Sequence, residues 1–75
     1  MKALDFQVAG NHYKDLPIQP AEYIYANAMG YLEGNVVKYI SRWRKKNGLD
    51  DLLKAKHYID LLIELENKYG NLSNP

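Results

Sequence analysis

Hydrophobic side chains recur every three or four residues along most of the chain after residue 19, which is the spacing of one face of an α-helix. The first such segment spans residues 20–31. Pro20 lies where a helix favours its first residue, and Glu22 in the first turn suits the positive end of the helix dipole. Gly30 and Gly34 lie at its end and in the turn after it. We therefore predict a first helix over 20–31.

A second helix is predicted over 36–46. Asn35 is a favourable N-cap for it, and Asn47 and Gly48 are expected to end it. Its apolar and aromatic side chains fall on one arc of the helix and should face the other two helices. These residues are Val36, Tyr39, Ile40 and Trp43.

A third helix is predicted over 51–69, with Asp50 as its N-cap and Gly70 at its end. Its apolar side chains spread over about 200° of the helix, whereas a helix on a globular domain usually buries a stripe of about 100°. They are Leu52, Ala55, Tyr58, Ile59, Leu61, Leu62, Ile63, Leu65 and Tyr69. The two shorter helices cannot easily cover so wide an arc, so we expect a homo-oligomer, a dimer or a tetramer. The alternative is that the N-terminal arm folds back over this surface.

The first nineteen residues show no sustained periodicity and include Gly10 and Pro17. We expect an extended or looped arm over 1–19, with room for a short strand at 4–8, and a frayed tail over 71–75. The predicted fold is therefore mainly α: a small three-helix domain over 20–70 with an N-terminal arm, assembling as a helical homo-oligomer. A chain of 75 residues buries only a modest core.

Composition excludes several classes of protein. The chain has no cysteine, which removes disulfides and thiolate chemistry, and its two histidines are too far apart to suggest a zinc site, so we expect no metal. No apolar run approaches the roughly 20 residues of a membrane-spanning helix. A net charge of +1 argues against binding duplex nucleic acid through overall charge. We expect a soluble, cytoplasmic protein without membrane contacts.

Positive charge is nevertheless concentrated in the second predicted helix. Lys38, Arg42 and Lys45 fall on one side of it at spacings of four and three residues. This could be a solvated basic face. It could also be an anion site, because glycine and Asn35 before the helix would offer backbone N–H groups at its positive end. The chain also has seven tyrosines, and tyrosine rings can stack on a base.

Enzymatic signatures are weak. The chain has no G-x-x-x-x-G-K-[ST] phosphate loop and no credible Ser-His-Asp arrangement. Asp50 and Asp51 could hold Mg²⁺, but we interpret them as the N-terminal cap of the third helix. We therefore assign no catalytic residue and no cofactor.

Four stretches together resemble a known family: "HYK" at 12–14, "IQP" at 18–20, "LEGNVVKYISRWRKK" at 32–46 and "DDLLKAKHYIDLL" beginning at 50. They are similar to the small SaV-like phage domain family, whose members are often labelled phage nucleotide kinases. Trp43 and Arg44 depart from the pattern, because relatives often have a small residue and a glycine there.

The resemblance implies phage origin, the cytoplasm of the infected bacterial host, and nucleotide handling. The positions that match the family pattern are candidate ligand-binding residues. They are His12, Tyr13, Gln19, Asn35, Lys38, Tyr39, Arg42, Lys54 and Tyr58. Lys38 and Arg42 would hold phosphates, Tyr13 or Tyr39 would stack on a base, and His12, Gln19 or Asn35 would read its edge.

Our leading hypothesis is a phage protein that sequesters a phosphate-bearing nucleotide signal of host defence, a cyclic dinucleotide, between its subunits without chemistry. One alternative is a nucleoside-monophosphate kinase that uses Asp51 on Mg²⁺. A second alternative is a helical adaptor that binds a host protein through the third helix.

Overall fold

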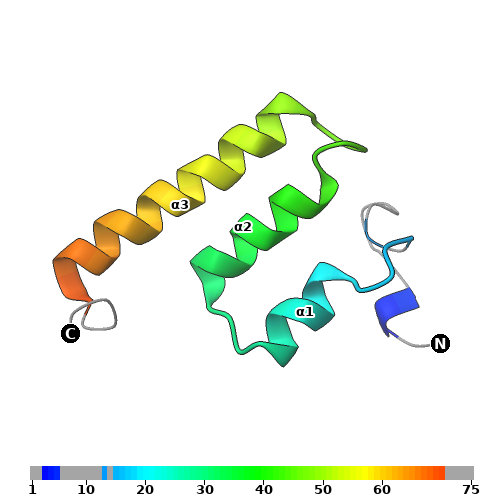
Figure 1. The fold of residues 1–75 in the computed structure, drawn as a ribbon, viewed down its shortest axis with the longest axis horizontal. Helices are drawn as coiled ribbons and strands as arrows, with labels where there is room; N and C mark the ends of the chain where they lie inside the picture. Colours follow the sequence, from blue (N-terminus) through cyan, green and yellow to red (C-terminus); the bar gives the residue numbers. More distant parts are fainter. Residues whose placement is uncertain (1–2, 6–12, 14, 71–75) are drawn as a thin grey trace.

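Three consecutive α-helices form the body of the protein (Figure 1). The computed structural model describes residues 3–5, 13 and 15–70. A short 3-10 helix, Ala3–Asp5, precedes α1 (Pro20–Ala26), α2 (Tyr31–Arg42) and α3 (Leu49–Tyr69). Within the described residues there is no strand, so the predicted three-helix, mainly α domain is confirmed. The strand suggested over 4–8 is wrong where it can be seen, because residues 4 and 5 belong to the 3-10 helix.

Helix α1 starts at Pro20 as predicted but ends at Ala26, five residues before the expected end. Its last turn is closed by Asn27, whose side-chain amide donates to the Tyr23 carbonyl at 2.9 Å. Ala28 then takes a left-handed conformation with φ of 54°, which an α-helix cannot continue through. The chain turns here and enters α2.

Helix α2 begins at Tyr31, five residues earlier than predicted, and the assignment of Asn35 as its N-cap is wrong. Gly30 is the N-cap residue, and its backbone N–H donates to the Glu33 carboxylate at 2.7 Å. Asn35 lies one turn inside the helix, where its side-chain amide donates to the Tyr31 carbonyl at 2.8 Å. The expected anion site of backbone N–H groups before residue 36 therefore does not exist, because those groups belong to the helix itself.

Gly34 lies inside α2 rather than in a turn, and it is buried against α1. A Cβ atom at this position would lie 3.2 Å from Cγ2 of Ile24, closer than side chains normally pack. A glycine is therefore needed here because α1 and α2 approach closely, and not because of an unusual backbone conformation. It sets the distance between α1 and α2.

Helices α2 and α3 run antiparallel, side by side, and the longer α3 extends past the beginning of α2 (Figure 1). The turn between them ends at Gly48, whose φ of 54° favours glycine. Helix α3 starts at Leu49, two residues earlier than predicted, with Gly48 rather than Asp50 as its N-cap. The most deeply buried residues of the described chain are Asp51 and Ala55, on the face of α3 that packs against α2.

The apolar arc of α3 is only partly covered by the described residues. Leu49, Leu53, Ile59 and Ile63 are exposed, as are Leu65 and Tyr69 on the part of the helix that extends past α2. Ile40 on α2 was expected in the core and is 49% exposed, because it lies on the side of α2 away from α3. The uncovered arc agrees with the reasoning behind the expected oligomer, while the assembly itself stays a prediction. No helix in the described part of the chain is long and apolar enough to cross a membrane.

We predict that Gly34→Val lowers the thermal stability of the domain. The new side chain would meet Ile24 and force α1 away from α2, an overpacking change that typically costs about 1–3 kcal/mol. Gly30→Ala is the matched control, because a Cβ there meets nothing closer than 3.8 Å, and it should cost less than about 1 kcal/mol. Thermal melts followed by circular dichroism measure both. Equal melting temperatures for the two variants would contradict this account of Gly34.

Candidate functional site

The ring of Tyr39 on α2 is the centre of a cluster of cations and aromatic rings. The Arg42 guanidinium carbon lies 4.6 Å from the ring centroid, the Lys38 ammonium 5.1 Å and the Lys54 ammonium 5.4 Å. Tyr58 from α3 stacks on the same ring, with centroids 5.9 Å apart and an interplanar angle of 17°. Helix spacing explains this: Lys38 and Arg42 are four residues apart on α2, and Lys54 and Tyr58 are four residues apart on α3.

Arg42 forms a two-pronged ion pair with Asp51 across the α2–α3 turn. Its Nε donates to Oδ2 at 3.2 Å and its Nη2 to Oδ1 at 3.1 Å. Nη1 donates to the Tyr13 hydroxyl at 3.3 Å, which ties one residue of the N-terminal arm to the site. Asp51 is fully buried and also accepts the backbone N–H of Asn47 at 3.3 Å. Asp51 is therefore a buried partner of Arg42 and of the turn, whereas we had expected it only as part of the N-terminal cap of the helix.

The ion pair shifts the pKa values of both partners. Burial alone would raise the pKa of Asp51, but the hydrogen bonds from Arg42 and Asn47 outweigh it and lower the pKa below its ordinary value. Burial would likewise lower the pKa of Arg42, and the hydrogen bonds to Asp51 and Tyr13 raise it instead. Both groups are thus held in their charged forms.

A second aromatic contact extends the cluster toward the start of α2. The Tyr31 ring meets Tyr58 edge-on, with centroids 6.1 Å apart and an angle of 79°. A hydrogen bond with Tyr31, followed by burial, raises the pKa of the Tyr58 hydroxyl. Tyr31 is 74% exposed, so one side of this tyrosine is open to a ligand.

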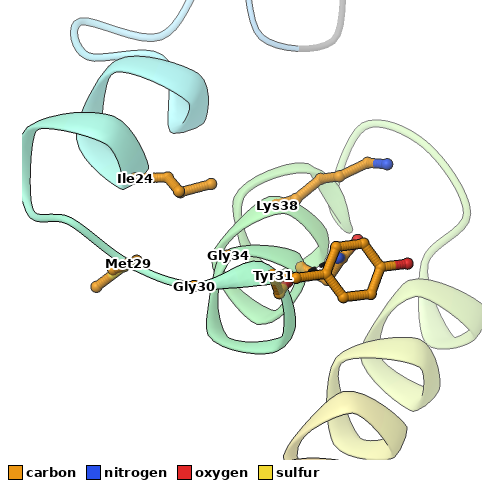
Figure 2. Close-up of a pocket in the computed structure, with 7 residues that line it drawn as sticks. Ile24, Met29, Gly30, Tyr31, Gly34 and Lys38 are labelled. Atoms are coloured by element: carbon orange, nitrogen blue, oxygen red, sulfur yellow. Dashed lines mark hydrogen bonds between the residues drawn. The ribbon is translucent and has the colours of Figure 1, made fainter.

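Two hollows flank the cluster, and Lys38 and Ile24 line both. The larger, about 290 Å³, lies between α1 and the first turns of α2 (Figure 2). Ile24 reaches from α1 toward Gly34, and Tyr31 and Lys38 extend from α2 (Figure 2). The smaller, about 170 Å³, is lined by Tyr13, Gln19, Pro20, Ala21, Ile24 and Lys38. The two hollows form a shallow, mostly apolar surface beside the cluster, and Lys38 is the cation that lines both of them.

The structure brings most of the candidate residues together. Those around the Tyr39 ring are Tyr13, Lys38, Tyr39, Arg42, Lys54 and Tyr58. Asn35 lines the larger hollow and Gln19 the smaller one, although the Gln19 amide also donates to the Leu4 carbonyl. His12 lies outside the described residues. Whether any of these residues binds a ligand stays a prediction.

Two residues of this site were missed. Asp51 was assigned to capping, and its pairing with Arg42 depends on how the α2–α3 turn folds, which no local pattern reveals. Tyr31 was placed at the end of the first helix, although its position seven residues before Lys38 puts both on one side of a continuous helix. Tyr31 would have been recognised as part of the site if the second helix had been predicted to begin after Gly30.

Arg44 and Lys45, two further basic residues near the end of α2, line a different part of the surface. The Arg44 guanidinium lies 5.3 Å from the Trp43 ring, and both line a separate hollow with Lys45, Leu16, Ile40 and Ser41. In the described part of the chain, no group of three or more histidine, cysteine or carboxylate side chains could hold a metal ion.

Comparison with protein families gives one match, over residues 8–60, to DUF3310, a family of proteins of unknown function. The chain belongs to the DUF3310 family. The matched stretch contains all nine candidate residues and ends within α3, nine residues before its last residue. The SaV-like and nucleotide kinase labels suggested by the sequence motifs stay predictions. No curated protein and no solved structure shows significant similarity to the chain.

We predict that Asp51→Asn strongly destabilises this DUF3310 domain. Removing one partner of a buried ion pair leaves the other charge without compensation, which costs about 3–5 kcal/mol. For a domain of this size, the melting temperature should fall by at least about 12 °C. Asp50→Asn, an exposed neighbour in the same turn, is the control and should melt close to the parent. If Asp51→Asn and Asp50→Asn had the same melting temperature, the Arg42–Asp51 ion pair would be unimportant for stability.

We also predict that acid weakens the domain through Asp51. A carboxylate whose pKa is lowered on folding stabilises the folded state above its unfolded pKa of about 3.8, and this stabilisation is lost as the pH falls through the native value. The free energy of unfolding in urea should therefore decrease progressively from pH 4 downward. Asp50→Asn should keep this dependence, whereas Asp51→Asn should lose its largest part. An identical pH profile for all three proteins would contradict the assignment.

Proposed function

We propose that this protein binds a phosphate-bearing nucleotide and sequesters it without chemistry. The observation that carries the proposal is that Lys38 and Lys54, from two different helices, place their ammonium groups about the same tyrosine ring. In the described part of the chain neither ammonium has an ion-pair partner, whereas the charge of Arg42 is balanced by Asp51. The net positive charge of the cluster therefore resides on the two lysines.

Electrostatics favours an anion at this place. Both ammonium groups lie within 5.4 Å of one ring centroid, so they are at most about 10.5 Å apart, which is close to the Debye length at physiological salt. The two lysines repel each other at this distance, and a phosphate between them would replace repulsion with two charge-assisted contacts. The tyrosine rings offer a surface for stacking on a base.

The sizes of the hollows favour a site completed by a second copy. Ligand pockets usually enclose about 300–1,000 Å³. The hollows of about 290 Å³ and 170 Å³ are below or at the edge of that range, so one chain encloses a base or a phosphate but not a dinucleotide. We therefore retain the sequence hypothesis of a cyclic dinucleotide held between subunits, as a host-defence signal in the cytoplasm of a phage-infected bacterium.

The proposed roles of individual residues change with the geometry. Lys38 and Lys54 hold the phosphate, and Arg42 shapes the site by holding Asp51 and Tyr13. Tyr39 is already packed against Arg42 and Tyr58, so Tyr31, which is exposed and lines the larger hollow, is the better residue for stacking on a base. Asn35 and Gln19 line the hollows from which a base edge would be read.

The two alternatives differ in what supports them. The kinase alternative needs Asp51 on Mg²⁺, but Asp51 is fully buried and both of its oxygens accept hydrogen bonds from Arg42. The adaptor alternative has an observation in its favour, namely the exposed apolar side chains of α3. It predicts no nucleotide binding.

The decisive experiment incubates the protein with a panel of mononucleotides and cyclic dinucleotides, denatures it, and analyses what is released. Recovery of an intact ligand supports sequestration, and recovery of a converted ligand supports the kinase. If nothing is retained, the proposal is wrong and the adaptor is favoured.

We predict that Lys38→Ala and Lys54→Ala each weaken nucleotide binding by about tenfold or more, since each removes a charge-assisted contact to phosphate. Affinity should also fall with added salt. Lys68→Ala is the matched control, because Lys68 makes the same kind of cation–ring contact with Tyr69 at the far end of α3. Isothermal titration measures the three affinities, and a thermal melt checks that folding is intact. Equal affinities would show that the lysines form a solvated basic face.

A further inference from the structure

Two lysines, an exposed tyrosine and the two hollows belong to one surface of the protein. Lys38 lines both hollows, and its ammonium lies beside the Tyr39 ring together with that of Lys54. Tyr31 extends from the same side of α2 as Lys38, seven residues earlier, and it is 74% exposed (Figure 2). Asn35, between them in the sequence, also lines the larger hollow. We call Tyr31, Asn35, Lys38 and Lys54 the lysine face.

One lysine face is too small for a whole cyclic dinucleotide. Such a ligand has two phosphates and two bases, and its halves are related by a two-fold axis when the bases are identical. The hollows of about 290 Å³ and 170 Å³ have room for one half at most, whereas a binding pocket normally buries about 70–90% of its ligand. The other half offers the same chemical groups, so it fits a second lysine face. Two identical surfaces facing each other form the interface that a two-fold axis requires.

We infer that the ligand itself joins two copies of this chain: one cyclic dinucleotide lies on a two-fold axis between two lysine faces, and these faces do not pair without it. The inference rests on the proposed function, and it states how a second copy completes the site. Each copy contributes its two lysines and its exposed tyrosine to one half of the ligand.

Charge makes the ligand necessary for this contact. In the described part of the chain Lys38 and Lys54 have no ion-pair partner, so each lysine face carries two uncompensated positive charges. Two such faces brought together without ligand would oppose four ammonium groups, and like charges across an interface are unfavourable. The two phosphates of the ligand place two negative charges where these ammonium groups meet. A dimer made through the exposed apolar side chains of α3 would have no such requirement.

A mononucleotide should behave differently from a cyclic dinucleotide. It has one base and one phosphate group, which a single lysine face accommodates, and it has no second half for another copy to bind. It should therefore bind one copy without joining two. The size of the ligand thus separates binding from assembly.

Sedimentation equilibrium measures the joining directly, with cyclic di-AMP and cyclic di-GMP as probes and adenosine monophosphate as the control. One cyclic dinucleotide for every two chains should raise the particle mass at least twofold, and the monophosphate should leave it unchanged. A large excess of cyclic dinucleotide should return the mass to its ligand-free value, because every copy then takes a ligand of its own.

The outcomes separate this inference from the proposed function. If a cyclic dinucleotide binds at one per chain and the mass stays unchanged, the inference is overturned while sequestration stands. If only the monophosphate binds, the inference is overturned and nucleotide binding stands. If no nucleotide binds, both fail.

Tyr31→Ala tests whether both copies contact the same ligand. Losing one stacked ring should weaken monophosphate binding about tenfold, but the two-chain complex loses the ring twice and should weaken about a hundredfold. Tyr25→Ala, which removes an exposed tyrosine that lines neither hollow, is the matched control and should change neither value. Tyr31→Phe retains the ring and should recover most of both losses. Equal losses for the two ligands in Tyr31→Ala would overturn the inference.

Discussion

The ion pair between Arg42 and Asp51 is the interaction on which the rest of the structure depends. It joins the last residue of α2 to the first turn of α3, and through the Tyr13 hydroxyl it also holds a residue of the N-terminal arm. A buried ion pair contributes little net stability compared with a well-packed apolar pair, yet breaking it is costly. Its effect is therefore on geometry: it fixes the register of α2 against α3, and with it the positions of Lys38, Tyr39, Lys54 and Tyr58.

The number of helices could be predicted from periodicity, but four of the six boundaries could not: the end of α1, both ends of α2 and the start of α3. Gly30 and Gly34 looked equivalent in the sequence, and the structure uses them in opposite ways. Gly30 begins α2 because Glu33 captures its N–H, while Gly34 lies inside the helix because α1 needs the space of a missing side chain. That need arises from a contact between helices, which no local pattern contains. Asn35 was misplaced for the same reason.

The candidate site was predicted better than the helices that form it. A spacing of four residues places Lys38 and Arg42 on one side of the second helix, so these two were recognisable from the sequence pattern. Lys54 and Tyr58 became candidates only through the family resemblance. What the sequence could not provide was the pairing across the turn, which neutralises Arg42 and leaves the two lysines as the net charge. The family match over 8–60 covers this site.

The size of α1 has a consequence for how the hollows open. This helix has seven residues and packs, among the described helices, only on α2. A helix so short is not stable by itself in water, so its order depends on its contacts with the rest of the chain, and among the described helices that means α2. The α2–α3 hairpin is closed by an ion pair of its own, to which α1 does not contribute. Helix α1, which forms one wall of the hollows, is thus the helix expected to unfold locally at the lowest cost. The cations and rings on α2 and α3 would then stay in place.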